Sequence, residues 1–197
     1  MGGLLARRLA PPVVILGITP SGVEVAANAA QAIGASFDVI VAAHVRFESL
    51  GIIGAIAEDC EAVLDADFQP RFGMMDALNE AIDKARRAIK TERLLFRGQR
   101  PLRSVEGATA VVVDGDVTSP WKVLAAAEAV GQLSPAAILV GAAVATRAAH
   151  NKIRARRIEF VCPNVVEDPG GHPRPFGDPK DPSAERLRSI VVAREAA

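Results

Sequence analysis

A short polar segment after the apolar run 109–113 holds the residues that are best placed to do chemistry. Asp114 and Asp116 alternate along the chain, so at the end of a strand their carboxylates face the same way and could hold hydroxyl groups or Mg²⁺. A helix is expected to begin near Pro120, and the free N–H groups and dipole of its first turn attract an anion. The segment therefore predicts a site for hydroxyl groups or a metal ion beside a site for an anion.

The same segment also has a purely structural explanation. Ser119 as N-cap and Pro120 as the first helical residue would start a helix without any ligand. Asp114 and Asp116 would then be acids at the solvated end of a strand. Lys122 and the remaining N–H groups could still bind phosphate, so both interpretations stay open at this point.

Short apolar runs alternate with helical segments through most of the chain, which predicts an α/β fold. The runs are apolar on both faces, as expected for a mostly parallel central sheet flanked by helices. The predicted strands are 13–18, 37–42, 109–113, 136–140 and 158–162, and the predicted helices are 23–33, 75–96, 121–130 and 144–154. Two further apolar runs, 52–57 and 62–64, indicate a hairpin or two small strands.

The chain of 197 residues is expected to form one domain, because this length lies within the range of an ordinary domain. Residues 1–162 would form the α/β domain itself. Residues 163–197 contain almost half of the 13 prolines and predict a loop-rich C-terminal tail that serves as a cap or arm of the same domain. Ser183 is a typical helix start and predicts a last short helix through Ile190.

The composition argues against several classes of partner. The 23 basic and 23 acidic side chains balance, there is no tyrosine, and Trp121 is the single tryptophan, so a stacking surface for nucleic acid has little to be built from. The apolar stretch 136–145 is about half of the roughly 20 residues that span a bilayer. We therefore expect no nucleic-acid partner, no membrane partner and a cytoplasmic location.

The segment 114–119 and the helix after it resemble the substrate loop of the type I phosphoribosyltransferases, in particular their bacterial branch. The likeness extends to 14–26, 33–41, 54–58 and 96–102, in the same order. In this family two adjacent acids meet the ribose hydroxyls of phosphoribosyl pyrophosphate, and loop amides hold its 5-phosphate. The resemblance implies the family's fold, a transferase activity that uses Mg²⁺, and a homodimer.

The resemblance also assigns roles to individual residues of this chain. Asp114 and Asp116 would be catalytic and would bind Mg²⁺. The other contacts to the substrate would come from the first loop (Thr19, Ser21 and Gly22), the segment after the second strand (His44 and Arg46) and the helix start (Thr118, Ser119 and Lys122). Because ligands of parallel α/β sheets bind beyond the carboxyl ends of the strands, the loops 19–22, 44–46 and 114–122 should converge.

The departures from the family pattern occur at positions that would contact the substrate. Pro20 stands where the family has arginine, and Ala43-His44 replaces a basic pair. Gly115 takes the place of the second acid. Pro120 and Trp121 replace the glycine and alanine of the phosphate loop, although proline offers no N–H and tryptophan crowds the approach of a ligand.

Two functions from different classes follow from this pattern. The first is a phosphoribosyltransferase-like protein that binds a phosphorylated ribose, either phosphoribosyl pyrophosphate or a nucleotide, at the Asp114–Lys122 loop. Its catalysis would be weakened or lost, and Mg²⁺ would be needed only for catalysis. The alternative is a non-catalytic module of the same fold for ligand sensing or subunit assembly. The loss of basic residues favours the alternative, because a polyanionic substrate needs compensating charge.

Overall fold

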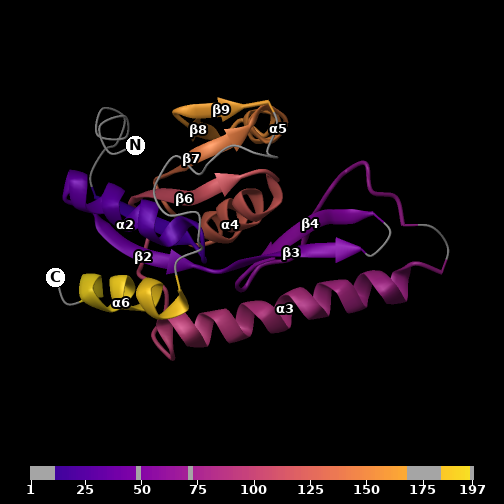
Figure 1. Ribbon diagram of the computed structural model, residues 1–197, viewed down its shortest axis with the longest axis horizontal. Coiled ribbons are helices and arrows are strands. Elements are labelled where there is room, and N and C mark those ends of the chain that lie inside the picture. The colour runs from indigo at the N-terminus through magenta and orange to yellow at the C-terminus, as the bar shows by residue number, and fades with distance from the viewer. Residues whose placement is uncertain (1–11, 48–49, 71–72, 168–182, 196–197) are drawn as a thin grey trace.

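The computed structural model describes residues 12–47, 50–70, 73–167 and 183–195, and a parallel sheet lies at its centre (Figure 1). The strand order is β2(Ser36–Ile40), β1(Val13–Ile18), β6(Thr109–Val117), β7(Ala137–Thr146) and β8(Glu159–Val161), and β9(Asn164–Val166) pairs with the far end of β7. Every pairing between these strands is parallel. The predicted α/β class with a mostly parallel central sheet is confirmed.

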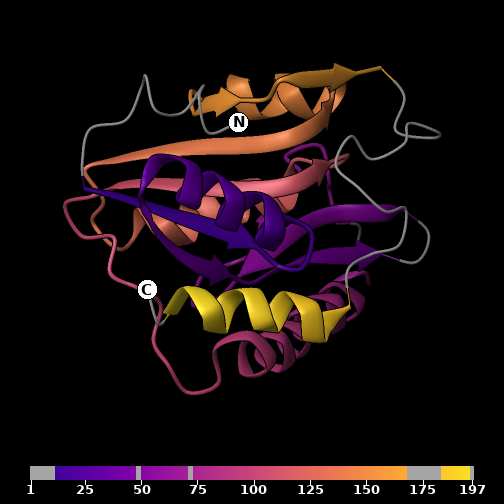
Figure 2. The same cartoon turned by 60° about the vertical axis from the view of Figure 1, so that its left-hand side comes forward.

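Helices cover both faces of this sheet (Figure 2). The bounds are α2(Gly22–Ile33) and α6(Ala184–Glu195) for one face, and α4(Trp121–Gly131) and α5(Arg147–Ala155) for the other. Side chains alternate between the two faces along each strand. Ile15 packs with α2 and α6, whereas its neighbour Leu16 packs with α4 and α5. The strands are continuously apolar because both faces are buried.

A second, antiparallel sheet extends from the end of β2 (Figure 1). It contains β3(Ala42–Phe47), β4(Gly51–Ala57) and β5(Val63–Leu64), and the long helix α3(Met75–Arg97) follows it. Val45 and Ile56 face α3, whereas Ala42 and Ala55 belong to the apolar cluster of α4. The second sheet therefore lies between these two helices, which brings β3 close to the start of α4.

The predicted hairpin of 52–57 and 62–64 is confirmed as the pair β4 and β5. The predicted strand 37–42 was wrong at its end, because β2 stops at Ile40 and Ala42 already belongs to β3. The Val41 N–H donates to the Glu58 carboxylate at 2.8 Å, so the chain leaves the central sheet at this residue. The alternating polar and apolar residues of β3 carried the signal for the missing strand.

Two predicted helix boundaries also needed correction. The helix predicted from residue 144 begins only at Arg147, because Val144–Thr146 pairs with β9. Thr146 caps this helix by accepting a hydrogen bond from the Ala149 N–H at 3.2 Å. The predicted helix start at Ser183 is supported by its hydroxyl, which accepts from the Arg186 N–H at 3.2 Å, but α6 continues beyond Ile190.

The last helix packs on the chain's own core, with Leu187 and Val191 buried against α2 and the sheet. The rest of the predicted tail, residues 168–182, lies outside the described residues. Among the helices that the structure describes, none is both long and apolar enough to cross a membrane.

A buried ion pair joins α3 to the junction of the two sheets. The Arg97 guanidinium donates to the Glu58 carboxylate and to the Val39 carbonyl, the latter at 3.0 Å. The two side chains are only 3% and 5% exposed. Since neither charge is hydrated, each depends on the other for compensation.

The loop between β1 and α2 packs directly on the end of β6. A Cβ on Gly22 would lie 2.1 Å from the Val113 carbonyl oxygen, and a Cβ on Gly115 would lie 2.4 Å from the Ser21 carbonyl oxygen. No side chain can occupy either position without moving the backbone. Gly115 is therefore required by this contact, which explains why an acid is absent at this place.

We predict that Arg97→Met lowers the free energy of unfolding by about 3–5 kcal/mol, because it leaves the Glu58 carboxylate buried without its partner. Urea denaturation at neutral pH measures this change. Arg86→Met is the matched control, because Arg86 forms exposed ion pairs that contribute at most about 1 kcal/mol. The double variant Glu58→Gln with Arg97→Met should recover part of the loss. No recovery would mean that packing, not charge, sets the cost.

A second prediction concerns the contact between Gly115 and Ser21. Gly115→Ala should lower the free energy of unfolding by about 1–3 kcal/mol, because the added methyl group forces the two loops apart. Gly131→Ala is the control: its Cβ would meet only the flexible Ile138 side chain at 3.6 Å, and alanine favours the helix. Equal stability of the Gly115→Ala variant and the wild type in urea would refute the close contact.

Candidate functional site

Asp114 lies at the centre of the candidate site and is 1% exposed. Its Oδ1 accepts hydrogen bonds from the Ser21 hydroxyl and from the Gly115 N–H, the latter at 2.8 Å. Its Oδ2 lies 3.4 Å from the Lys122 ammonium. Both carboxylate oxygens are therefore engaged, and Asp114 joins the β1–α2 loop to the start of α4.

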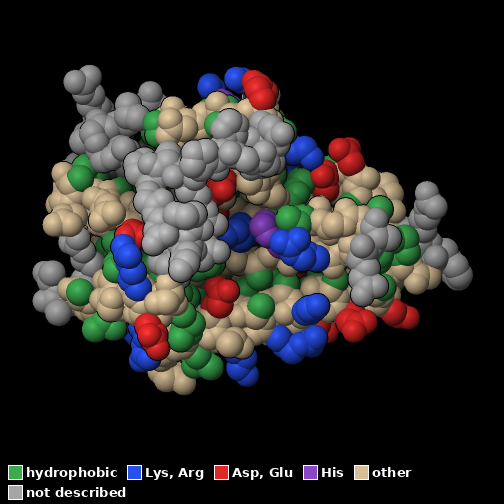
Figure 3. Space-filling model, viewed as in Figure 1, with side chains coloured by type: hydrophobic (Ala, Val, Ile, Leu, Met, Phe, Trp, Pro, Cys, Tyr) green, Lys and Arg blue, Asp and Glu red, His purple; other side chains and the backbone are tan. Residues whose placement is uncertain are grey.

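His44 reaches this cluster from β3 in the second sheet. The pKa of His44 is lowered from 6.5 to about 4, chiefly by burial and also by the nearby charges of Lys122 and Arg46, against the opposing effect of Asp114. The Ser21–Asp114 hydrogen bond joins the loop 19–22 to the loop 114–122, and the electrostatic effects of Asp114 and Lys122 on His44 place the segment 44–46 near them. Figure 3 shows a histidine with basic side chains beside it in the middle of the face drawn. The His44 ring is neutral at pH 7, and its Nε2 is buried without a hydrogen-bond partner among the described residues.

The start of α4 differs from the predicted cap. Its N-cap is Pro120 in helical conformation (φ −74°, ψ −14°), and Leu124 N–H donates to the Pro120 carbonyl at 3.0 Å. The Ser119 hydroxyl therefore does not cap the helix, since a side-chain cap needs an extended N-cap residue. It is buried and without a partner in the part of the chain that the structure describes. Thr118 is exposed, and its carbonyl accepts from the Thr146 hydroxyl at 3.4 Å.

The hydroxyl and the N–H of Thr19 already have partners within the chain. Its side chain is 1% exposed, and its hydroxyl donates to the Glu92 carboxylate of α3 at 2.6 Å. Its N–H donates to the Ile40 carbonyl at 3.1 Å. Glu92 was not predicted as a site residue, because only the packing of α3 brings it to this loop.

Trp121 belongs to the core as well as to the altered phosphate loop. Its side chain is 6% exposed and packs in the apolar cluster around α4. The Lys152 ammonium lies 5.0 Å from the centre of the indole ring and 2.9 Å from the Asp65 carboxylate. Trp121 of α4 therefore contacts Lys152 of α5, which in turn binds Asp65 after β5. Because the indole is also packed in the core, its replacement by alanine would leave a large cavity.

The donors present do not suit a protein-held Mg²⁺ ion. The described residues contain no group of three or more acid, histidine or cysteine side chains that could hold a metal. Asp116 is exposed, and the Lys122 ammonium already stands at the free oxygen of Asp114. A divalent cation would have to displace Lys122 to reach this carboxylate.

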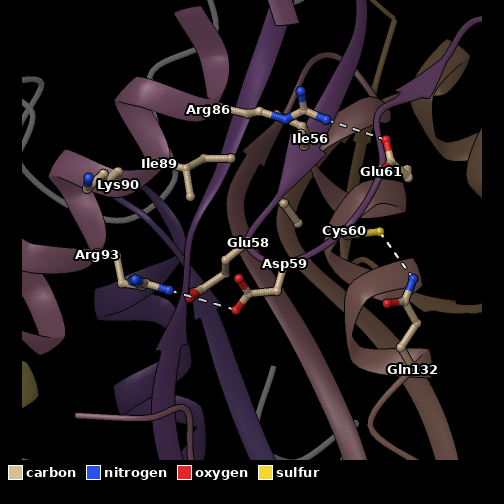
Figure 4. A pocket seen from close by; sticks show the side chains of 11 residues that line it. Ile56, Glu58, Asp59, Cys60, Glu61, Arg86, Ile89, Lys90, Arg93 and Gln132 are labelled. Atoms are coloured by element: carbon tan, nitrogen blue, oxygen red, sulfur yellow. Dashed lines mark hydrogen bonds and ion pairs between the residues drawn. The ribbon is translucent and has the colours of Figure 1, made fainter. Parts of the chain in front are cut away.

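A separate cavity of about 490 Å³ lies between α3 and the chain after β4 (Figure 4). Gln132, just past the C-terminal end of α4, lines it, whereas the candidate site adjoins the N-terminal end. Arg93 pairs with Asp59 at 3.8 Å, and Arg86 pairs with Glu61 at 3.5 Å. Because cations face acids across this cavity, it presents no uncompensated charge of one sign to a ligand.

No protein-family model matches the chain. The protein TT1426 of Thermus thermophilus is similar to it in structure, with a TM-score of 0.73, 26% sequence identity, and coverage of 98% of this chain and 94% of that one. A hypoxanthine phosphoribosyltransferase of Staphylococcus aureus has a TM-score of 0.50 at 8% identity, with 85% of this chain and 69% of that chain covered. The chain thus shares the fold of the phosphoribosyltransferases, as the sequence resemblance implied.

Proposed function

We propose that this phosphoribosyltransferase-like protein binds a phosphorylated ribose compound at the Asp114–Lys122 loop. Three groups at this loop carry the proposal: the Lys122 ammonium lies at Asp114, the Ser119 hydroxyl stands three residues before Lys122 in the chain, and the His44 ring lies near both of these charges. The last two present buried polar atoms without partners among the described residues. Buried polar groups normally have partners, so these atoms indicate a place where a polar ligand binds.

Each group has a role that follows from its chemistry. Lys122, the Ser119 hydroxyl and the free N–H groups of the first turn of α4 would hold the 5-phosphate. Asp116, exposed at the end of β6, would accept hydrogen bonds from the ribose hydroxyls. Asp114 would position Lys122 and Ser21 through its two oxygens. His44 Nε2 and Arg46 would border the ligand from the second sheet.

The non-catalytic module remains the second candidate, and one observation favours it. The loop 19–22, which would receive the pyrophosphate group of a transferase substrate, contains no basic residue, and its Thr19 hydroxyl is bound to Glu92. Release of pyrophosphate from phosphoribosyl pyrophosphate in the presence of purine or pyrimidine bases distinguishes the two candidates. Transfer supports an enzyme, whereas binding without transfer supports a ligand-binding module.

Calorimetric titration with ribose 5-phosphate tests the proposed site. We expect the wild type to bind it, and Lys122→Met to weaken binding about tenfold or more, because a charge-assisted hydrogen bond contributes about 1.5–3 kcal/mol. Ser119→Ala should weaken binding less, because its hydroxyl is neutral. Lys90→Met, in the separate cavity, is the matched control and should bind as the wild type does. Absence of binding by the wild type, or equal losses in Lys122→Met and Lys90→Met, would refute the site.

The low pKa of His44 predicts a pH dependence of stability. The unfolded chain protonates this ring near pH 6.5, whereas the folded chain resists protonation down to about pH 4. Stability should therefore fall as the pH drops from about 6.5 towards 4, and His44→Gln should remove this part of the loss. Urea denaturation across this range, with NMR titration of the His44 ring, measures both effects. A His44 ring that titrates near 6.5 in the folded protein would contradict the burial described here.

A further inference from the structure

We propose that the site takes a ligand with a single phosphate group, such as ribose 5-phosphate or a nucleoside 5′-monophosphate, without a metal ion and in preference to phosphoribosyl pyrophosphate. This inference rests on the proposed function and narrows its ligand class. It follows from the charges at the two ends of the site, namely the start of α4 and the loop 19–22.

At the α4 end, the Lys122 ammonium occupies the place beside Asp114 that a metal ion bound by this carboxylate would take. Lys122 lies 3.4 Å from Asp114 Oδ2 with its side chain only 15% exposed, so solvent screens this attraction weakly. The other oxygen of Asp114 is already occupied by Ser21 and Gly115. The ammonium group thus compensates the buried carboxylate itself, and it leaves Asp114 no free oxygen with which to hold Mg²⁺.

At the other end, the loop 19–22 offers a diphosphate no basic side chain. Pro20 has no N–H, the Thr19 N–H is bound to the Ile40 carbonyl, and the Thr19 hydroxyl is bound to Glu92. The Glu92 carboxylate therefore places a negative charge at this loop. A diphosphate group there would be desolvated beside a carboxylate and without a basic partner in the loop, which is unfavourable.

The charges between these two ends also argue against a ligand with three phosphate groups. His44 lies near Lys122, Arg46 and Asp114 and is neutral at pH 7, so among the described residues that act on this ring the permanent cations are Lys122 and Arg46. One of them is shared with Asp114. Asp116 adds a second acid at the end of β6, so these two cations leave no surplus of positive charge for the three phosphate groups of phosphoribosyl pyrophosphate.

Calorimetric titration of the full chain with ribose 5-phosphate and with phosphoribosyl pyrophosphate, each in EDTA and in Mg²⁺, tests the inference. We expect ribose 5-phosphate to bind with the same Kd in both conditions. Phosphoribosyl pyrophosphate should bind no more tightly, with or without Mg²⁺. Tighter binding of phosphoribosyl pyrophosphate by about tenfold in Mg²⁺ would overturn the inference and leave the proposed function standing. Absence of binding by both ligands would overturn the proposed function and the inference together.

A metal readout tests the role of Lys122 independently of any sugar phosphate. Electron paramagnetic resonance with Mn²⁺ alone should show no binding by the wild type or by Lys122→Arg, but binding by Lys122→Met, in which Asp114 has lost its cation. Circular dichroism establishes that each variant is folded. Mn²⁺ binding by the wild type at a site that Asp114→Asn abolishes would overturn the inference, as would a folded Lys122→Met variant that binds no Mn²⁺.

The role of Glu92 has its own matched pair of variants. Glu92→Gln keeps an acceptor for Thr19 but removes the charge, so it should raise the affinity for phosphoribosyl pyrophosphate several-fold relative to that for ribose 5-phosphate. Glu80→Gln makes the same change at an exposed position of the same helix and should leave this ratio unchanged. An unchanged ratio in Glu92→Gln would overturn the proposed discrimination at the loop.

Discussion

The contact between the β1–α2 loop and the end of β6 determines the arrangement of the candidate site. Glycine at positions 22 and 115 allows two backbone segments to approach to a distance that any Cβ would prevent. At this distance the Ser21 hydroxyl reaches Asp114, and Asp114 in turn holds Lys122 at the start of α4. One backbone contact thus fixes the positions of an acid, a hydroxyl group and a cation from three different elements.

Electrostatic balance is the second constraint, because most of these groups are removed from water. A buried carboxylate such as Asp114 requires a partner, and a nearby lysine provides it within the chain. The same cation helps to keep His44 neutral, so Lys122 influences the charge of two groups of the site. At the junction of the two sheets, the Glu58 carboxylate is also buried, and the Arg97 guanidinium compensates its charge.

The fold alone says less about function than the side chains of the site do. The similarity to a phosphoribosyltransferase at 8% identity concerns the backbone, and one fold supports many activities. The side chains decide which ligand the same backbone can accept. In this chain Gly115 and Pro20 depart from the residues that the resemblance implies for contacts to the substrate, and the proposed phosphate site rests on Lys122 and Ser119.

The sequence alone determined the central sheet, because the periodicity of buried strands and helices is a local property of the chain. It also indicated that the loops at 19–22, 44–46 and 114–122 meet, since the carboxyl ends of parallel strands share one edge of a sheet. Only the tertiary structure shows which partner each polar group binds. The Thr19 hydroxyl donates to the Glu92 carboxylate, Pro120 rather than Ser119 is the N-cap of α4, and the Lys122 ammonium compensates the charge of Asp114. These outcomes depend on partners that packing brings together from distant parts of the chain, and no local pattern encodes such partners.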